Sequence, residues 1–256
     1  MDQLPVELIT TIAFLACQDG GYTGASLSRV SRRIRDASHS ARFYTVSLAS
    51  CPERFSKFIY AYETQHNRLP DTVPRVRHLF LSLLPIEGEP IYRVPELPFC
   101  EVFTAYDQYL ALLHHLGQTY GPTLCTLVTL VAPEVETLSV IRGEWKGVPI
   151  VPCAFPRLRE LTLVDACPEF LSIDDTPVAS PRFPALERLH TVEHFYARPL
   201  DLRRWAPHAP RLTHVRCSGL HYRRSPTAAS LAALAGEPLP APLLRMSGRA
   251  LTRPPV

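Results

Sequence analysis

The sequence lacks the usual marks of secreted, membrane-spanning and nucleic-acid-binding proteins. Its seven cysteines are an odd number at scattered spacing with no Cys-x-x-Cys pair, which favours reduced thiols over a disulfide framework. No apolar run approaches the roughly twenty residues of a membrane span, and no basic start indicates a signal peptide. The net charge of +3 is too small to indicate nucleic acid. We therefore expect a soluble protein of the cytoplasm or nucleus, with no membrane or nucleic-acid partner.

Motifs that carry catalysis are also missing. There is no Gly-x-Ser-x-Gly, and no Gly-Lys-Ser/Thr follows the glycines of residues 19–24. His190 and His194 have the spacing of a metal pair, but no third ligand is identifiable nearby, so we expect an ordinary strand-to-loop segment. We expect the two histidines at residues 114–115 to be a solvent-facing pair. We expect the two aspartates at residues 174–175 to lie in a turn. The sequence therefore predicts no catalytic residue, no metal and no cofactor.

Glycine is scarce, whereas proline is abundant. The 256 residues contain 11 glycines and 26 prolines, and the prolines are spread along the chain, so that they separate short elements. A hydrophobic content of 46% is ample for a packed core in one or two domains. Residues 223–256 differ in composition, being rich in Ala, Pro, Leu and Arg without a core pattern, and we expect a weakly ordered tail there.

The first segment opens with a clear helix signal. Pro5 suits the first helical position, where the amide that it lacks would have no partner. Glu7 then lies where its charge meets the positive end of the helix dipole. Apolar residues recur at helical spacing, at Leu4, Leu8, Ile12 and then Leu15 or Ala16.

A turn-rich break at residues 18–24 separates this helix from a second helical pattern over residues 27–37. The arginines of that pattern, Arg32, Arg33 and Arg35, favour a solvated helix face beside a partner's acids over a nucleic-acid patch. Residues 41–48 alternate and are aromatic or β-branched, which predicts a strand.

Together, these residues resemble an F-box. The family pattern has a Leu-Pro-x-Glu-Ile opening, and residues 4–9 read Leu-Pro-Val-Glu-Leu-Ile. Its third helix reads Val-Cys-Lys/Arg-x-Phe/Trp-Arg-x-Leu-Ala, and residues 30–37 read Val-Ser-Arg-Arg-Ile-Arg-Asp-Ala. Ser31 replaces the usual cysteine, and Ile34 replaces the usual aromatic. Residues 43–48 resemble the Phe-x-x-Val-x-Leu strand that often follows an F-box.

The resemblance implies that the N-terminal helices dock on a Skp-type adaptor, and through it on a cullin, while the rest of the chain binds an unknown target protein. The predicted function is the substrate-recognition subunit of a Skp–cullin–F-box ubiquitin ligase, a non-catalytic subunit that acts by positioning its target. The predicted adaptor contacts are apolar, with one arginine at the rim: Leu4, Pro5, Leu8, Ile9, Ile12, Val30, Arg33 and Ile34.

A repeat covers much of the remaining chain. It consists of a proline followed by aliphatic residues two and five positions later, and by a residue seven positions later that is aliphatic, Thr or Cys. The last three spacings, of 23 to 28 residues, fall in the window of leucine-rich repeats. Strands of this kind bury alternate side chains and are expected to lie parallel, joined by helices or irregular segments. The repeats start at Pro74, Pro133, Pro156, Pro184 and Pro210.

The sequence therefore predicts an α/β fold: an N-terminal helical F-box of about three helices, a leucine-rich-repeat-like solenoid with parallel strands, and an irregular tail. The predicted boundaries are 1–42 for the F-box, 43–222 for the divergent repeat domain and 223–256 for the tail. Within the repeat domain we expect helices over 52–65, 102–116 and 123–131 and a strand over 76–83, and neither a helix nor a central strand over 84–100, because of its prolines.

Three alternatives stay open. The apolar residues of the first helices form the first core of an ordinary α/β domain; or the chain is a free-standing repeat scaffold with a helical cap and no ligase role; or it is an α/β hydrolase, which requires a pocket with convergent polar groups. The partner interpretation is favoured because two or three helices in about forty residues have more apolar positions than they can bury alone.

Overall fold

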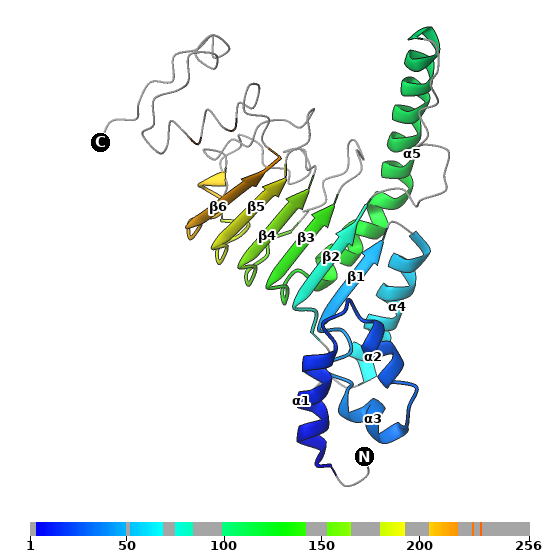
Figure 1. The fold of residues 1–256 in the computed structure, drawn as a ribbon, viewed down its shortest axis with the longest axis vertical. Coiled ribbons are helices and arrows are strands. Elements are labelled where there is room, and N and C mark those ends of the chain that lie inside the picture. The colour runs from blue at the N-terminus through cyan, green and yellow to red at the C-terminus, as the bar shows by residue number, and fades with distance from the viewer. Residues whose placement is uncertain are drawn as a thin grey trace, which may run out of the picture.

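The structure, a computed structural model, describes residues 4–49, 52–68, 75–83, 99–141, 153–164, 180–192 and 205–219, together with Thr227 and Leu231. It has a mixed α/β architecture in which a six-stranded parallel sheet forms the larger part, with three short helices beyond one end of it (Figure 1). None of the described helices combines the length and the apolar character needed to cross a membrane.

The strands of the sheet lie side by side in chain order, β1-β2-β3-β4-β5-β6, and every pairing is parallel (Figure 1). The order never reverses, so the sheet is neither a closed barrel nor a doubly wound sheet with a switch point. The strands are β1 (Thr45–Ala49), β2 (His78–Ser82), β3 (Thr137–Ile141), β4 (Glu160–Val164), β5 (Arg188–Val192) and β6 (His214–Ser218).

The predicted repeat corresponds to β2–β6, and the prediction of parallel strands is confirmed. Equivalent repeat positions lie in register on neighbouring strands and point to one side of the sheet, because side chains alternate along each strand. The strand predicted at 41–48 is also confirmed, and Val46 of β1 lies beside Leu79 in the same register. The row continues through the second apolar position of each repeat, Leu79, Leu138, Leu161, Leu189 and Val215.

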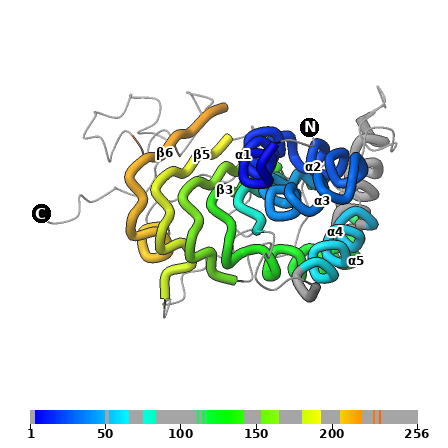
Figure 2. The backbone as a smooth tube through the Cα atoms, turned by 90° about the horizontal axis from the view of Figure 1, so that it is seen from below, coloured from blue at the N-terminus to red at the C-terminus, as the bar shows by residue number. Residues whose placement is uncertain are grey.

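Two helices cover the apolar side of the sheet at its β1 end, α4 (Pro52–Arg68) and α5 (Phe99–Val131), and they pack against each other (Figure 2). The helices predicted over 52–65, 102–116 and 123–131 are confirmed, but the last two form one helix that continues through Pro122. Helix α5 starts at Phe99, although the prolines of residues 84–100 predicted no helix there, so that prediction was wrong for residues 99 and 100. Residues 84–98 lie outside the described part of the chain.

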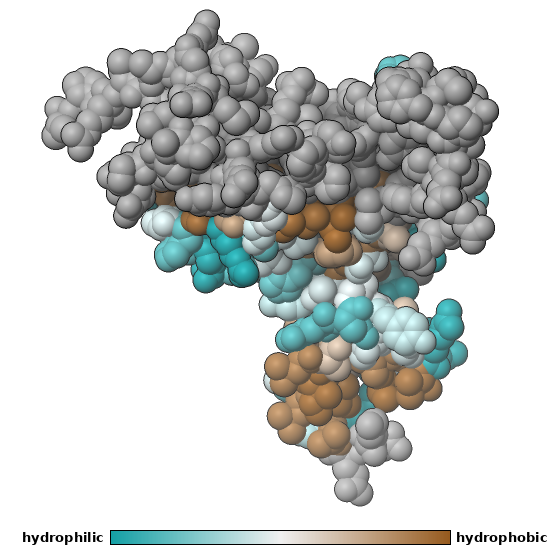
Figure 3. Space-filling model, turned by 45° about the horizontal axis from the view of Figure 1, so that its top comes forward, coloured by the Kyte–Doolittle hydropathy of each residue, from teal (hydrophilic) through white to brown (hydrophobic). Residues whose placement is uncertain are grey.

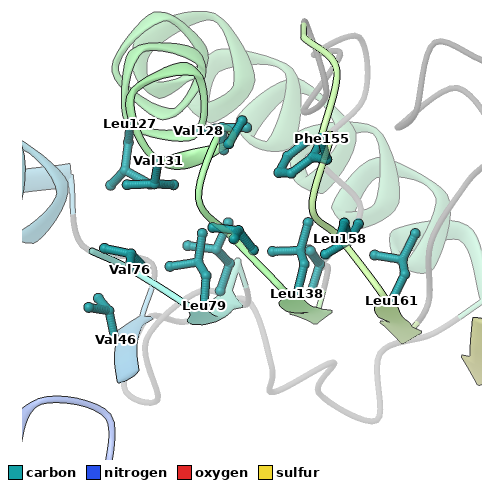
Figure 4. Packing of buried hydrophobic residues seen from close by; sticks show 14 of the residues in the cluster. Val46, Val76, Leu79, Leu127, Val128, Val131, Leu138, Phe155, Leu158 and Leu161 are labelled. Atoms are coloured by element: carbon teal, nitrogen blue, oxygen red, sulfur yellow. The ribbon is translucent and has the colours of Figure 1, made fainter. Parts of the chain in front are cut away.

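The main core lies between these helices and the sheet. Figure 4 shows side chains from the end of α5 turned toward the buried row of the strands. Side chains of the turns before the strands continue the core toward β6: the rings of Phe155 and Phe183 stack 5.9 Å apart, and those of Phe183 and Trp205 stack 5.8 Å apart. The fully buried members of the core include Phe55, Leu81, Leu124, Leu127, Phe155 and Phe183.

Three short helices form the N-terminal unit: α1 (Val6–Ala16), α2 (Tyr22–Leu27) and α3 (Arg32–Ala37). The sequence predicted one helical pattern over 27–37, and this was wrong, because α2 ends at Leu27 and α3 starts after a turn. Ser31 has an extended backbone with a φ of −158°, and its hydroxyl oxygen accepts a hydrogen bond of 3.2 Å from the amide of Ile34. Ser31 is therefore the N-cap that starts a new helix.

The N-terminal unit is joined closely to β1. The carbonyl of Gly20 accepts a 3.0 Å hydrogen bond from the amide of Ser47, and Gly20 has a φ of 78°. A Cβ at Gly20 would lie 2.5 Å from the Cβ of Ser47. The ring of Phe14 in α1 packs edge-on against Tyr44 at 5.2 Å, and Tyr44 packs against His78 of β2 at 5.0 Å.

The predicted tail, residues 223–256, lies outside the described part of the chain except for two residues. Thr227 is fully buried and Leu231 is partly buried.

Candidate partner-binding surfaces

Helix α1 is apolar on two faces, and only one of them is covered. Ala13 and Cys17 are buried in a small core with Ala41. On the other face, Leu8 is 51% exposed and Ile12 is 53% exposed. Phe14 and Leu27 pack against this core, whereas Leu8 and Ile12 lie on the uncovered face of α1 and remain at the surface.

The remaining predicted adaptor contacts lie on the same unit. Pro5 and Leu4 are exposed, and Val30, in the turn before α3, is 63% exposed. Three predicted contacts are only partly exposed: Ile9, Arg33 and Ile34.

Polar contacts hold α3 against α1. The guanidinium of Arg33 donates a hydrogen bond to the carbonyl of Leu4. Thr10 of α1 donates a 2.9 Å hydrogen bond to the carbonyl of Ala37, at the end of α3. The first of these contacts gives Arg33 a structural role, in addition to the role at the rim of the adaptor interface that the resemblance implies.

The prediction missed one large contributor to this surface. Leu15 is 69% exposed, and it lies one turn after Ile12. Its helical spacing from Leu8 and Ile12 was the signal that could have identified it. We use the term apolar patch for Leu4, Leu8, Ile12, Leu15 and Val30, and Figure 3 shows apolar residues gathered over the N-terminal helices.

The exposed fractions of side chains in the N-terminal unit argue against the alternative in which these helices form the first core of an ordinary α/β domain. If the helices formed the first core of an ordinary α/β domain, the side chains of Leu8, Ile12 and Val30 would be buried, but all three are at least half exposed. Contiguous exposed apolar surface of this kind is typical of sites that bind another protein.

A second surface is the side of the sheet opposite to the core, which we call the polar face after its first two rows; its third row includes the apolar residues Ala49, Ile141, Val164 and Val192. Its middle row, in register across the strands, is Ser47, Phe80, Ser139, Thr162, His190 and Arg216. The row before it is Thr45, His78, Thr137, Glu160, Arg188 and His214.

Hydrogen bonds and ion pairs connect neighbouring strands on the polar face. The Nδ1 of His78 lies 2.7 Å from the hydroxyl of Thr137, and Glu160 pairs with Arg188 at 2.5 Å. Burial lowers the pKa of His78, and nearby Arg77 acts in the same direction, while Glu136 and Glu160 oppose the shift.

The candidate metal and catalytic residues do not come together. His190 lies in β5 with its Nε2 3.0 Å from the hydroxyl of Ser218, and His194 lies outside the described residues. The pair at residues 114–115 is exposed on α5, as predicted, and the pair at 174–175 lies outside the described residues. Within the described part of the chain, no three His, Cys, Asp or Glu side chains are placed to hold a metal ion.

Comparison of the chain with protein-family models, with curated proteins and with solved structures found no match. The function is therefore argued from the two surfaces themselves.

Proposed function

We propose that this chain is the substrate-recognition subunit of a Skp–cullin–F-box ubiquitin ligase. In this proposal, residues 1–42 are an F-box that binds a Skp-type adaptor, and residues 43–222 are a divergent leucine-rich-repeat-like solenoid that binds the target. The observation that carries the proposal is the apolar patch, since its side chains stay exposed while a separate face of α1 packs in the core of the N-terminal unit.

The energetic case for a partner comes from the same side chains. Full burial of a Leu or Ile side chain contributes about 1.5–3 kcal/mol, so covering the exposed half of each such residue contributes about 1 kcal/mol. With five residues in the patch, a partner that covers it gains a substantial part of the free energy of binding. Arg33, beside the start of α1, supplies a cation at the rim for an acid of the partner.

The departures from the family pattern are compatible with this reading. Ser31, where the family usually has cysteine, caps α3 and fixes where that helix begins. Ile34 is partly buried and keeps an apolar side chain at the position of the usual aromatic. The glycines at residues 20–21 allow the loop between α1 and α2 to approach β1 closely.

The mechanism is positioning. A receptor that binds the adaptor at one end and the target on its repeats raises the effective concentration of the target near the ubiquitin-charged enzyme, so that no cofactor is needed. The parallel strands in chain order and the repeat spacing of 23 to 28 residues support a solenoid as the target-binding part.

The test is capture of a recombinant Skp-type adaptor by the full chain. We expect Leu8→Asp together with Ile12→Asp to reduce affinity at least about 100-fold, because two carboxylates would be desolvated in the interface without partners. The matched control is Tyr60→Asp, which changes a large side chain of α4 that is 74% exposed and outside the patch. Circular dichroism confirms that each variant is folded, and retained binding in the double variant would contradict the proposed interface.

A second candidate is a free-standing repeat scaffold in which the N-terminal unit only caps the sheet. The hydrogen bond from the amide of Ser47 to the carbonyl of Gly20 favours it, because this bond occupies a backbone group of β1, the first strand of the sheet. This candidate predicts a folded chain with no affinity for the adaptor. The same capture experiment therefore separates the two.

A further inference from the structure

The middle row of the polar face changes character from one end to the other. At β2, the side chain of Phe80 is 36% exposed. It is a far larger side chain than that of Ser47, which lies beside it on β1. At the far end, Arg216 of β6 is exposed and lies beside the partly buried His190 of β5. One end of the row is apolar and the other is cationic.

The two positions between these ends are occupied by small hydroxyl side chains. Ser139 of β3 and Thr162 of β4 are partly exposed, and they lie in register between Phe80 and His190. Both side chains are short, and their hydroxyls can donate and accept hydrogen bonds between Phe80 and His190.

The charges of the polar face favour an acidic occupant. Among the described strand residues, the acidic side chain on this face is Glu160, and it already forms an ion pair of 2.5 Å with Arg188. Arg216 has no acidic partner within the described part of the chain, and His214 lies beside Arg188 in the neighbouring row. A carboxylate placed over β5 and β6 therefore meets the guanidinium of Arg216, which forms no ion pair with an acid among the described residues.

We propose that this row binds an extended acidic peptide segment of a target protein, with one apolar residue over Phe80 and carboxylates over His190 and Arg216. Neighbouring strands are about 4.8 Å apart, so Phe80 and Arg216 are about 19 Å apart, which is about six residues of extended peptide. The inference rests on the proposed function, since it assigns the chemistry of the target that the repeats receive.

The test uses a fluorescent ten-residue peptide with one phenylalanine and a run of glutamates that starts about four residues later, titrated onto the full chain by fluorescence anisotropy. A peptide with lysines in place of the glutamates tests the charge, and a single-stranded RNA oligonucleotide tests a polyanion of another class. We expect the acidic peptide to bind and its affinity to fall as NaCl rises from about 0.05 to 0.5 M, because exposed charges are screened.

Variants of the row locate the binding. Arg216→Glu is expected to weaken binding at least about tenfold through like-charge repulsion, and Phe80→Ser about threefold or more through the lost apolar contact. Arg216→Lys keeps the charge and is expected to retain most of the affinity. The matched control is Arg54→Glu on α4, which covers the opposite side of the sheet.

The assignment would be overturned if the acidic peptide did not bind, or if the lysine peptide bound equally well. It would also be overturned if Arg54→Glu lost as much peptide affinity as Arg216→Glu. Preference for the RNA with the same dependence on Arg216 would overturn it in favour of a nucleic-acid ligand. Adaptor capture keeps the two proposals distinct: Arg216→Glu is expected to lose peptide binding and keep capture, whereas an unmodified chain that captures the adaptor and does not bind the acidic peptide is a failure of this inference alone. Peptide binding by a chain that never captures the adaptor is a failure of the ligase assignment.

Discussion

Gly20 determines how closely the N-terminal unit packs on the sheet. Its φ of 78° lies in the left-handed region, and an added Cβ would lie 2.5 Å from the Cβ of Ser47. Gly21 has a φ of 98°, but an added Cβ would lie 3.5 Å from its nearest neighbour, the carbonyl oxygen of Thr45. A side chain at Gly20 would therefore meet both backbone strain and steric overlap, whereas a side chain at Gly21 would meet backbone strain alone.

We expect Gly20→Ala to lower the free energy of unfolding by about 2 kcal/mol or more, since strain and overlap act together. Gly21→Ala has the strain alone and is expected to cost about 1 kcal/mol. Urea unfolding of both variants measures the difference. Equal losses would show that the contact between Gly20 and Ser47 is not tight.

His78 gives the fold a dependence on pH. Burial lowers the pKa of its ring below the ordinary value of 6.5, so the folded state favours the neutral form. The resulting stability is present above pH 6.5 and is lost as the pH falls through the lowered pKa of the folded state. Burial lowers the pKa of His39 in the same direction.

We therefore expect the urea midpoint to fall between about pH 7 and pH 5.5, and His78→Asn to remove part of that fall. The asparagine keeps a polar group near Thr137 but does not titrate. Parallel pH profiles for the variant and the unmodified chain would show that His78 does not contribute.

At the scale of secondary-structure elements, α3 depends on its cap. The helix has only six residues, and helices this short are marginal without support at their ends. Ser31→Ala removes the acceptor for the Ile34 amide and is expected to cost about 1 kcal/mol, whereas Ser31→Asp keeps an acceptor and most of the stability. Hydrogen exchange at the amides of α3 measures the effect, and unchanged exchange in the alanine variant would contradict it.

The strands were predictable, because a Leu-x-Leu pattern at a fixed distance from proline buries alternate side chains wherever it occurs. The helices were less so. The pattern over 27–37 continues at helical spacing through residues 28–31, and only the cap chemistry of Ser31 shows that a turn intervenes. The segments 102–116 and 123–131 were predicted as separate helices, but packing of the second segment against the sheet keeps α5 continuous through Pro122.

At the scale of the whole molecule, the two surfaces were predictable to different degrees. The outer face of α1 follows from its helical spacing, although nothing in that spacing says which of its two apolar faces stays exposed. The packing of Ala13, Phe14 and Cys17 in the N-terminal unit shows which face is covered. Phe80 and Arg216 are far apart in sequence, and the register that places them in one row was implicit in the repeat, since both occupy the position six residues after the proline.

Packed aromatic rings connect the two surfaces. Phe14 of α1, Tyr44 and His78 of β2 form a continuous line of rings from the N-terminal unit to the polar face. A partner on α1 and a ligand over β2 would therefore be held in a fixed relation by packed side chains.

The strand order has a consequence for how such a chain changes during evolution. Each strand from β2 to β5 pairs only with the strand before it and the strand after it, so the gain or loss of one whole unit disturbs two junctions and leaves all others as they were. If the proposed function holds, the gain or loss of a unit far from α1 would change the face offered to a target and leave the opening helices unaltered.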